Sequence, residues 1–296
     1  MKKLNFIIKY GLALLLLSFY SCESWLNVTP SDRLSEEMLF NDREGFVKAL
    51  NGVYIELNTN ELYGRNLTAG ALDVMGQYYS VASSSHAFYN YGGLVYTGND
   101  EKALFDNMWQ KCYAVIACCN TIIEKCDENK AGLSPVWKGS IKGEALALRA
   151  MLHFDMLRLF GPLTSELDKE SIPYQTNSDQ TVTPLLSGSE VIGLILDDLK
   201  NAVGLLKDTD PYFVEEEFSD TDLNYRRFRM NYFAAKGLMA RVQLWGGDKE
   251  KAAATAKEVI AEGQAEGAEF FPFVTNSEAT SSNPDRVFYS EVLFGT

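Results

Sequence analysis

The stretch from Pro135 to Phe160 is apolar on almost every side of a helical projection, and no other feature constrains the fold as strongly. Pro135 suits the first turn of a helix and Gly161-Pro162 is a stop signal, so the pattern predicts one long helix between them. A helix with one wet side would carry a polar face, and we therefore expect this helix at the centre of the molecule. Its charged side chains must then be paired or reach solvent, namely Glu144, Arg149, Asp155 and Arg158.

Apolar residues recur at helical spacing in five further stretches. These stretches are 41–57, 99–126, 187–206, 231–245 and a last one that carries Ala252 to Ile260. We expect capping boxes at two of the starts, formed by Asn41 with Glu44 and by Ser187 with Glu190.

The segment from Ala240 to Ala252 resembles a tetratricopeptide hairpin. It has a small residue on the first helix, a Gly247-Asp248 turn and an alanine where the second helix packs, and small residues let two helices approach closely. The earlier helices do not repeat this motif cleanly. The sequence therefore predicts a mainly α fold, an irregular array of tetratricopeptide-like helical hairpins with long loops.

The balance of charges limits the partners of this chain. It has 27 basic and 40 acidic residues, and its net charge is −13. Such a surface repels nucleic acid and anionic lipid headgroups, so we expect no nucleic-acid partner and a neutral or cationic ligand.

The cysteines and histidines do not indicate a metal site. Cys112, Cys119 and Cys126 repeat every seven residues within a predicted helix, which separates consecutive sulfurs by about 10 Å. That distance is too long for a disulfide or a shared metal ion, and we expect buried apolar fillers. Of the two histidines, His153 lies on the central helix and is expected to be a core residue, whereas His86 lies in a loop and could touch a ligand.

The N-terminus has the pattern of a bacterial lipoprotein. Lysines open the chain, a short apolar run from Gly11 to Leu17 follows, and the small residue Ser21 precedes Cys22. The run is too short to span a bilayer. We expect residues 1–21 to be a signal peptide and Cys22 to carry acyl chains that anchor the protein in a lipid bilayer, followed by a tether over 22–40. Phe19 and Tyr20 depart from the usual pattern, and ordinary cleavage beside an incidental cysteine is the alternative.

Tyrosines are concentrated in residues 59–98, which we predict to be mostly loop with one short helix near 69–79. Five of the fifteen tyrosines of the chain lie between 78 and 96. Tyrosine offers a flat apolar face and a polar tip, which suits pyranose rings. The candidate ligand-binding residues are Tyr89, Tyr91, Tyr96, Asn90, Asn99 and Asp73. The alternative is that these rings only pin the loop to the helices.

Three stretches together resemble the SusD/RagB family of Bacteroidetes outer-membrane lipoproteins. They are Cys22 to Tyr54 with Ala49-Leu50-Asn51-Gly52-Val53-Tyr54, then Trp109 to Pro162 with Trp109-x3-Tyr113 and Phe160-Gly161-Pro162, and last Ala234 to Val242 with the Gly-Asp turn after it. The resemblance implies a cell-surface protein that binds oligosaccharide and hands it to a SusC-like TonB-dependent transporter of the outer membrane.

Members of that family are usually around twice this long. We therefore expect 41–270 to be the helical N-terminal domain and 271–296 to begin a truncated C-terminal region, with Ser290 to Phe294 as its first strand. We found no motif of a hydrolase, a metalloprotease or a phosphate-binding loop, and expect no enzymatic activity and no cofactor. A helical-repeat lipoprotein that only binds proteins is the alternative function.

Overall fold

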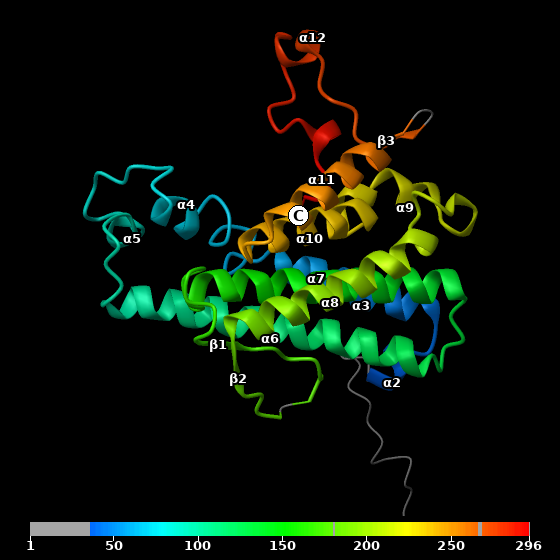
Figure 1. Ribbon diagram of the computed structural model, residues 1–296, viewed down its shortest axis with the longest axis horizontal. Coiled ribbons are helices and arrows are strands. Elements are labelled where there is room, and N and C mark those ends of the chain that lie inside the picture. The colour runs from blue at the N-terminus through cyan, green and yellow to red at the C-terminus, as the bar shows by residue number, and fades with distance from the viewer. Residues whose placement is uncertain (1–35, 180, 266–267, 296) are drawn as a thin grey trace, which may run out of the picture. The chain divides into compact units, whose positions relative to one another are not determined.

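The computed structural model describes residues 36–179, 181–265 and 268–295 (Figure 1). The chain divides into two units, 1–39 and 40–296. Helix α2 (Glu36–Leu39) is the described part of the first unit. Cys22 and the expected signal peptide lie outside the described residues, so the anchor stays a prediction, as do the predicted domain boundaries.

The second unit is mainly helical, as predicted. Its longer helices are α3 (Arg43–Leu57), α6 (Asn99–Glu128), α7 (Pro135–Phe160), α8 (Gly188–Thr209), α10 (Tyr232–Trp245) and α11 (Lys249–Gly263). Its shorter helices are α4 (Ala71–Met75), α5 (Tyr89–Gly92), α9 (Asp220–Asn224), α12 (Asn276–Ala279), η2 (Glu215–Glu217), η3 (Arg226–Phe228) and η4 (Tyr289–Glu291). The strands form two antiparallel pairs. Strand β1 (Glu170–Pro173) pairs with β2 (Leu185–Ser187), and β3 (Gln264–Ala265) pairs with β4 (Ala268–Glu269).

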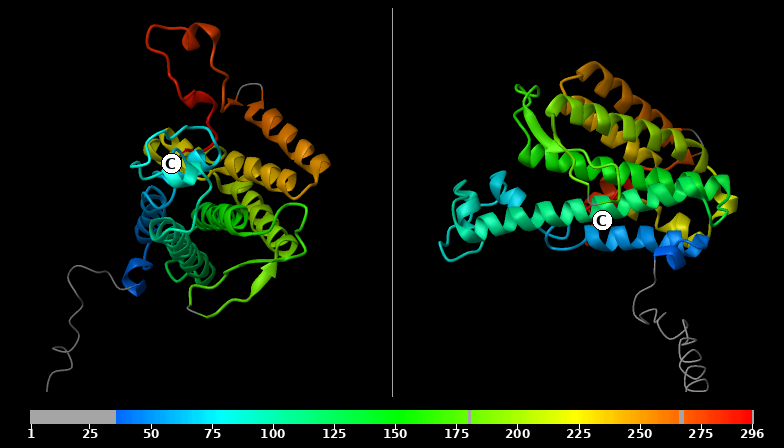
Figure 2. Two further views of the ribbon diagram at one scale, coloured as in Figure 1. Left: turned by 90° about the vertical axis from the view of Figure 1, so that its left-hand side faces the viewer. Right: turned by 90° about the horizontal axis from the view of Figure 1, so that it is seen from below.

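Helices that follow one another in the sequence pack side by side. Helix α7 packs on α6 and on α8, α8 also packs on α10, and α10 packs on α11 (Figure 2). Helix α3 lies against α6 and α7. The central position predicted for α7 is confirmed, because most of its side chains are buried. Gly143 lets α8 approach, since a Cβ atom at this position would lie 2.7 Å from Cγ of Leu206.

The helix ends follow local hydrogen bonding, with one correction to the prediction. Asp42, and not Asn41, caps α3: its Oδ1 accepts a hydrogen bond from the Gly45 amide at 2.8 Å. The capping box of Ser187 and Glu190 is confirmed. Helix α6 ends two residues later than predicted, where Asn129 adopts the left-handed conformation.

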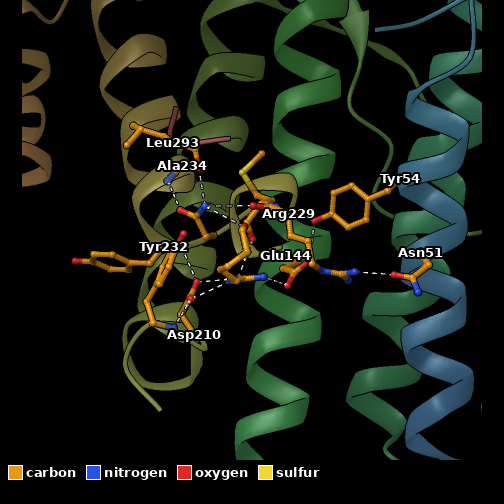
Figure 3. A network of polar contacts seen from close by, with 12 residues as sticks. Asn51, Tyr54, Glu144, Asp210, Arg229, Tyr232, Ala234 and Leu293 are labelled. Carbon is orange, nitrogen blue, oxygen red and sulfur yellow. Dashed lines mark hydrogen bonds and ion pairs between the residues drawn. The ribbon is translucent and has the colours of Figure 1, made fainter. Parts of the chain in front are cut away.

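Arg226 belongs to a buried ionic network, of which Figure 3 labels Tyr54, Glu144, Asp210 and Arg229. Its guanidinium donates to both carboxylate oxygens of Asp210, at 3.0 and 2.7 Å, and also to Glu144 on α7. Tyr54 of α3 donates to Glu144 Oε2 at 2.7 Å, and Arg229 donates to the same oxygen at 3.2 Å. Burial alone would lower the pKa of Arg226, but the two carboxylates outweigh burial and raise it. The network therefore joins α3, α7 and the segment before α10.

Asp210 directly follows α8 and is a buried member of this network. Helix α8 continues to Thr209, and the Asp210 side chain is completely buried. Besides its two bonds from Arg226, Asp210 Oδ2 accepts a hydrogen bond from the Tyr232 amide at 2.8 Å, at the first residue of α10. The Tyr212 amide also donates to Asp210 Oδ1, at 3.0 Å, so four hydrogen bonds offset the desolvation of this carboxylate.

A second polar cluster joins α7 to the β1–β2 hairpin. Arg149 donates to both oxygens of Asp198 on α8, each at 2.7 Å, and to Asn120 on α6 at 2.8 Å. His153 is a buried core residue, as predicted: its Nδ1 lies 2.9 Å from the Arg149 carbonyl oxygen, and its Nε2 accepts from the Gln175 amide. Burial lowers the pKa of His153 to about 3, so the ring is neutral.

The C-terminal segment does not form the predicted strand at 290–294. Residues 289–291 form a 3₁₀ turn, and Val292 to Gly295 run along the start of α10 without pairing to a strand. Asn231 Nδ2 donates to the Leu293 carbonyl at 2.7 Å, and the Gly295 amide donates to the Arg227 carbonyl at 3.0 Å. None of the helices in the described residues combines the length and apolar character needed to cross a membrane.

Candidate functional site

The tyrosine-rich connection between α4 and α6 lies beside the first turns of α6 (Figures 1 and 2). Helix α4 leads into a loop over 76–88, and the short helix α5 follows that loop. Gln77 has a positive φ of 62°, and its side chain donates to the Val74 carbonyl at 3.2 Å and to the Gly92 carbonyl at 3.0 Å. One side chain thereby ties α4 to α5.

Tyr91 anchors this connection to the helices. Its ring is only 2% exposed and lies 5.9 Å from Phe88, 6.4 Å from Tyr96 and 6.0 Å from Phe105 of α6, measured between ring centroids. Tyr96 is half-buried and packs edge-on against Phe105 at 5.4 Å. Burial raises the pKa of both phenols. These two rings pin the loop to α6.

Two other tyrosines face an open depression of about 420 Å³. Tyr79 is 54% exposed and Tyr89 is 42% exposed. The depression is lined by Gln77, Tyr79, Ser80, Val81, Tyr89, Asn90, Gly92, Gly93 and Val95. Rings, amides and a hydroxyl therefore meet on one surface, which is the combination that a sugar ring requires.

The polar candidates divide between this depression and its surroundings. Asn90 lines the depression and donates to Glu101 Oε1 of α6 at 2.7 Å, and this hydrogen bond lowers the pKa of Glu101. Asn99 is exposed at the first residue of α6, and Asp73 is half-buried in α4; neither lines the depression. Of the six candidates, the structure brings Tyr89 and Asn90 together in it.

Sequence reasoning missed Tyr79 and Gln77 as lining residues. Both belong to the tyrosine-rich run, but the pattern of the run does not distinguish an open ring from an anchoring one. The missing signal is Phe105, whose packing with Tyr91 and Tyr96 decides which rings turn inward.

A second depression, of about 430 Å³, has a different character. It is lined by three carboxylates, Asp42, Glu44 and Glu217, and by one aromatic side chain, Trp137. The Arg43 guanidinium lies 4.8 Å from the Trp137 ring centre and the Phe218 ring lies 4.6 Å from it, so this indole is engaged by its neighbours. It offers a sugar no free aromatic face.

Other residues considered in the sequence are structural. Cys112, Cys119 and Cys126 are completely buried, and burial raises the pKa of each thiol. Asn120 is buried and donates to the Gln175 and Asn177 carbonyls. Within the ranges that the structure describes, no group of three or more His, Cys, Asp or Glu side chains is arranged to hold a metal ion.

Paired helices with an aromatic, polar depression on a connecting loop define a helical protein with a candidate ligand surface. The sequence also matches, over residues 24–244, the SusD-like family described as "Starch-binding associating with outer membrane". This chain therefore belongs to the SusD-like family, and the resemblance drawn from three stretches of sequence is confirmed.

Individual relatives support this assignment. SusD-like protein P2 of Formosa agariphila is 26% identical over 265 residues, which are 87% of this chain and 46% of that protein. A SusD-like protein of Bacteroides ovatus is 30% identical over 146 residues, 48% of this chain and 23% of that protein. The chain thus spans about half or less of the length of the curated relatives it matches.

Solved structures show the same fold. A putative sugar binding protein from Bacteroides vulgatus superposes with a TM-score of 0.64 at 24% identity, over 86% of this chain and 54% of that one. A SusD-like carbohydrate binding protein from the same species gives 0.62 at 23% identity, over 80% of this chain and 47% of that one.

Proposed function

We propose that this chain binds glycan in the depression lined by Tyr79 and Tyr89. The observation that carries the proposal is the pairing of two open tyrosine rings with the amide of Asn90 on a loop that Tyr91 anchors to α6. Aromatic rings stack against the C–H faces of a pyranose, while amide and hydroxyl groups hydrogen-bond its hydroxyls. Glycoside hydrolysis needs a pair of carboxylates, and the residues that line this depression include none. We therefore propose binding without catalysis.

In the same proposal, the protein acts at the outer membrane as a lipoprotein anchored through Cys22 and displayed at the cell surface. Its captured oligosaccharide passes to a SusC-like TonB-dependent transporter. The family description, which associates starch binding with the outer membrane, supports this placement.

Affinity electrophoresis over a panel of polysaccharides tests the binding site. We expect Tyr89→Ala and Tyr79→Ala each to weaken binding to the retarding polysaccharide by about tenfold, because one stacked ring contributes about 1–1.5 kcal/mol. Tyr225→Ala, which removes an exposed ring from another part of the chain, is the matched control. Equal retardation of all three variants and the parent would reject this depression as the site.

Protein crosslinking on intact cells tests the partner. A SusC-like transporter is expected among the products, and protease added outside the cells is expected to digest the protein. Protection from that protease would contradict surface display and favour a scaffold that faces the periplasm.

A further inference from the structure

The connection that contains the depression carries no charge over a long run of sequence. Residues 74–98 include no Asp, Glu, Lys or Arg, although these four types make up 23% of the chain. All the residues that line the depression lie within this run, so its whole surface is formed by uncharged side chains and glycines. Charged side chains are mostly found on protein surfaces, so an exposed run of this length would ordinarily carry some.

The polar groups of the depression suit hydroxyl groups. Ser80 and the two open tyrosines supply hydroxyls that both donate and accept, and Asn90 and Gln77 supply amides. Gln77 already donates to two backbone carbonyls, and Asn90 already donates to Glu101. The remaining hydrogen-bonding capacity is neutral, and none of it comes from a cation.

The charged groups at the edge of the run do not favour an anion either. Glu101, at the side next to Asn90, is a carboxylate whose pKa is lowered by the Asn90 hydrogen bond, so it stays ionised. Arg65 contacts Phe88 of this run: its guanidinium lies 5.8 Å from the Phe88 ring centre, and its Nε donates to the Asn66 side chain at 3.1 Å. A ligand anion in the depression would meet the negative charge of Glu101 next to Asn90, and no lining residue would offer it a cation.

From these observations we infer that the depression takes an uncharged glycan and rejects sulfated or uronic-acid polysaccharides. The inference rests on the proposed function and adds the class of glycan. An anionic group placed in the depression would lose water without gaining a charged partner, and this desolvation is costly. The net charge of −13 acts in the same direction, because it repels a polyanion before contact.

The test compares neutral polysaccharides with sulfated and carboxymethylated derivatives of the same backbones. Starch, xylan and galactomannan serve as the neutral probes. We expect at least one neutral probe to bind, its anionic derivatives to bind about tenfold more weakly or not at all, and the neutral binding to be unchanged up to about 0.5 M NaCl. Tighter binding of an anionic derivative, lost in Tyr89→Ala, would overturn the inference and leave the proposed function standing. If no probe binds, or if Tyr89→Ala has no effect on binding, the proposed function fails as well.

A designed cation provides the second arm. Ser80 is exposed and lines the depression, so Ser80→Lys places a positive charge there, and Ser80→Gln is the uncharged control of similar length. Ser80→Lys is expected to gain about tenfold in affinity for the anionic derivatives, in a manner that NaCl abolishes. If Ser80→Lys and Ser80→Gln bind those derivatives equally, charge does not decide selection at this surface and the inference is wrong.

Discussion

At the scale of single residues, the charged side chains on and around α7 decide how the neighbouring helices can pack. Arg226 is 1% exposed, and it compensates two buried carboxylates, Asp210 and Glu144. A buried ion pair adds little net stability compared with an apolar core, but removal of one partner leaves an uncompensated charge. The network therefore fixes which segments meet more than it increases stability.

Arg226→Met is expected to lower the free energy of unfolding by about 3–5 kcal/mol, because Asp210 and Glu144 would remain buried without their cation. The measurement is urea denaturation followed by circular dichroism. Lys48→Met is the control: its ion pair with Glu44 is largely exposed, and we expect a change within about 0.5 kcal/mol. Equal losses in the two variants would contradict a special role of the buried network.

His153 predicts a pH dependence of stability. Its pKa is about 3 in the folded protein and lies near 6.5 when the chain is unfolded, so the unfolded state takes up the proton first as the pH falls. The contribution of the neutral His153 ring to the free energy of unfolding is fully present above pH 6.5. It is lost between about pH 6.5 and pH 3, at up to about 1.4 kcal/mol per pH unit.

The measurement is the free energy of unfolding of the parent minus that of His153→Gln, followed over this pH range. The subtraction removes the carboxylates that titrate in the same window. His86→Gln, at the exposed histidine, is the control for loss of an imidazole elsewhere in the chain. A flat difference for His153→Gln would contradict a neutral buried ring.

At the scale of helices and strands, small residues set the distances between packed elements. Gly143 on α7 faces Leu206 on α8, whereas Gly204, two residues before Leu206, has no neighbouring atom within 4 Å of the place where a Cβ atom would lie. The same substitution should therefore have opposite effects at the two positions. Gly143→Ala forces α7 and α8 apart and is expected to cost about 1–3 kcal/mol of unfolding free energy.

Gly204→Ala, in contrast, is expected to stabilise by about 0.4–1 kcal/mol, because it restricts the unfolded chain without a clash in the helix. Thermal unfolding of the two variants, side by side, is the measurement. If both variants change the free energy of unfolding in the same direction, the close approach of α7 and α8 at Gly143 does not explain the effect.

The sequence predicted elements with a strong period or an unambiguous cap, and failed where distant contacts decide. Helix α7 and the Ser187 capping box follow from local pattern and were predicted. Asp210 looks like any acidic loop residue in sequence, and its burial depends on Arg226, sixteen positions away. The segment at 290–294 has the composition of a strand, but in this structure it contacts the start of α10 and has no strand beside it.

The candidate site shows the same limit. Composition drew attention to the tyrosine-rich run, because a cluster of tyrosines is visible without any structure, and the depression lies within that run. Which rings are open depends on packing against Phe105 and on the Gln77 bridge between α4 and α5. These contacts have no periodic signature, so sequence alone selected the buried Tyr91 together with the open Tyr89.

At the scale of the whole molecule, the proposed function requires the charged helical unit to be held where glycans arrive. The net charge of −13 gives no electrostatic attraction to an anionic lipid surface. In the proposed function, attachment therefore comes from hydrophobic insertion, and acyl chains supply about 0.8 kcal/mol for each buried methylene group. The proposed anchor at Cys22 thus accounts for attachment without any contribution from the protein surface.

Cys22→Ala is expected to release the protein from the membrane fraction into the soluble fraction of lysed cells, because two or more acyl chains are needed for stable attachment. Cys118→Ala is the matched control, since Cys118 is an exposed thiol on α6 and its loss should leave the protein with the membranes. Fractionation followed by immunoblotting is the measurement, and mass spectrometry of the N-terminal peptide identifies the lipid directly. Membrane attachment that survives Cys22→Ala would mean that some other part of the protein, or a bound partner, holds it there.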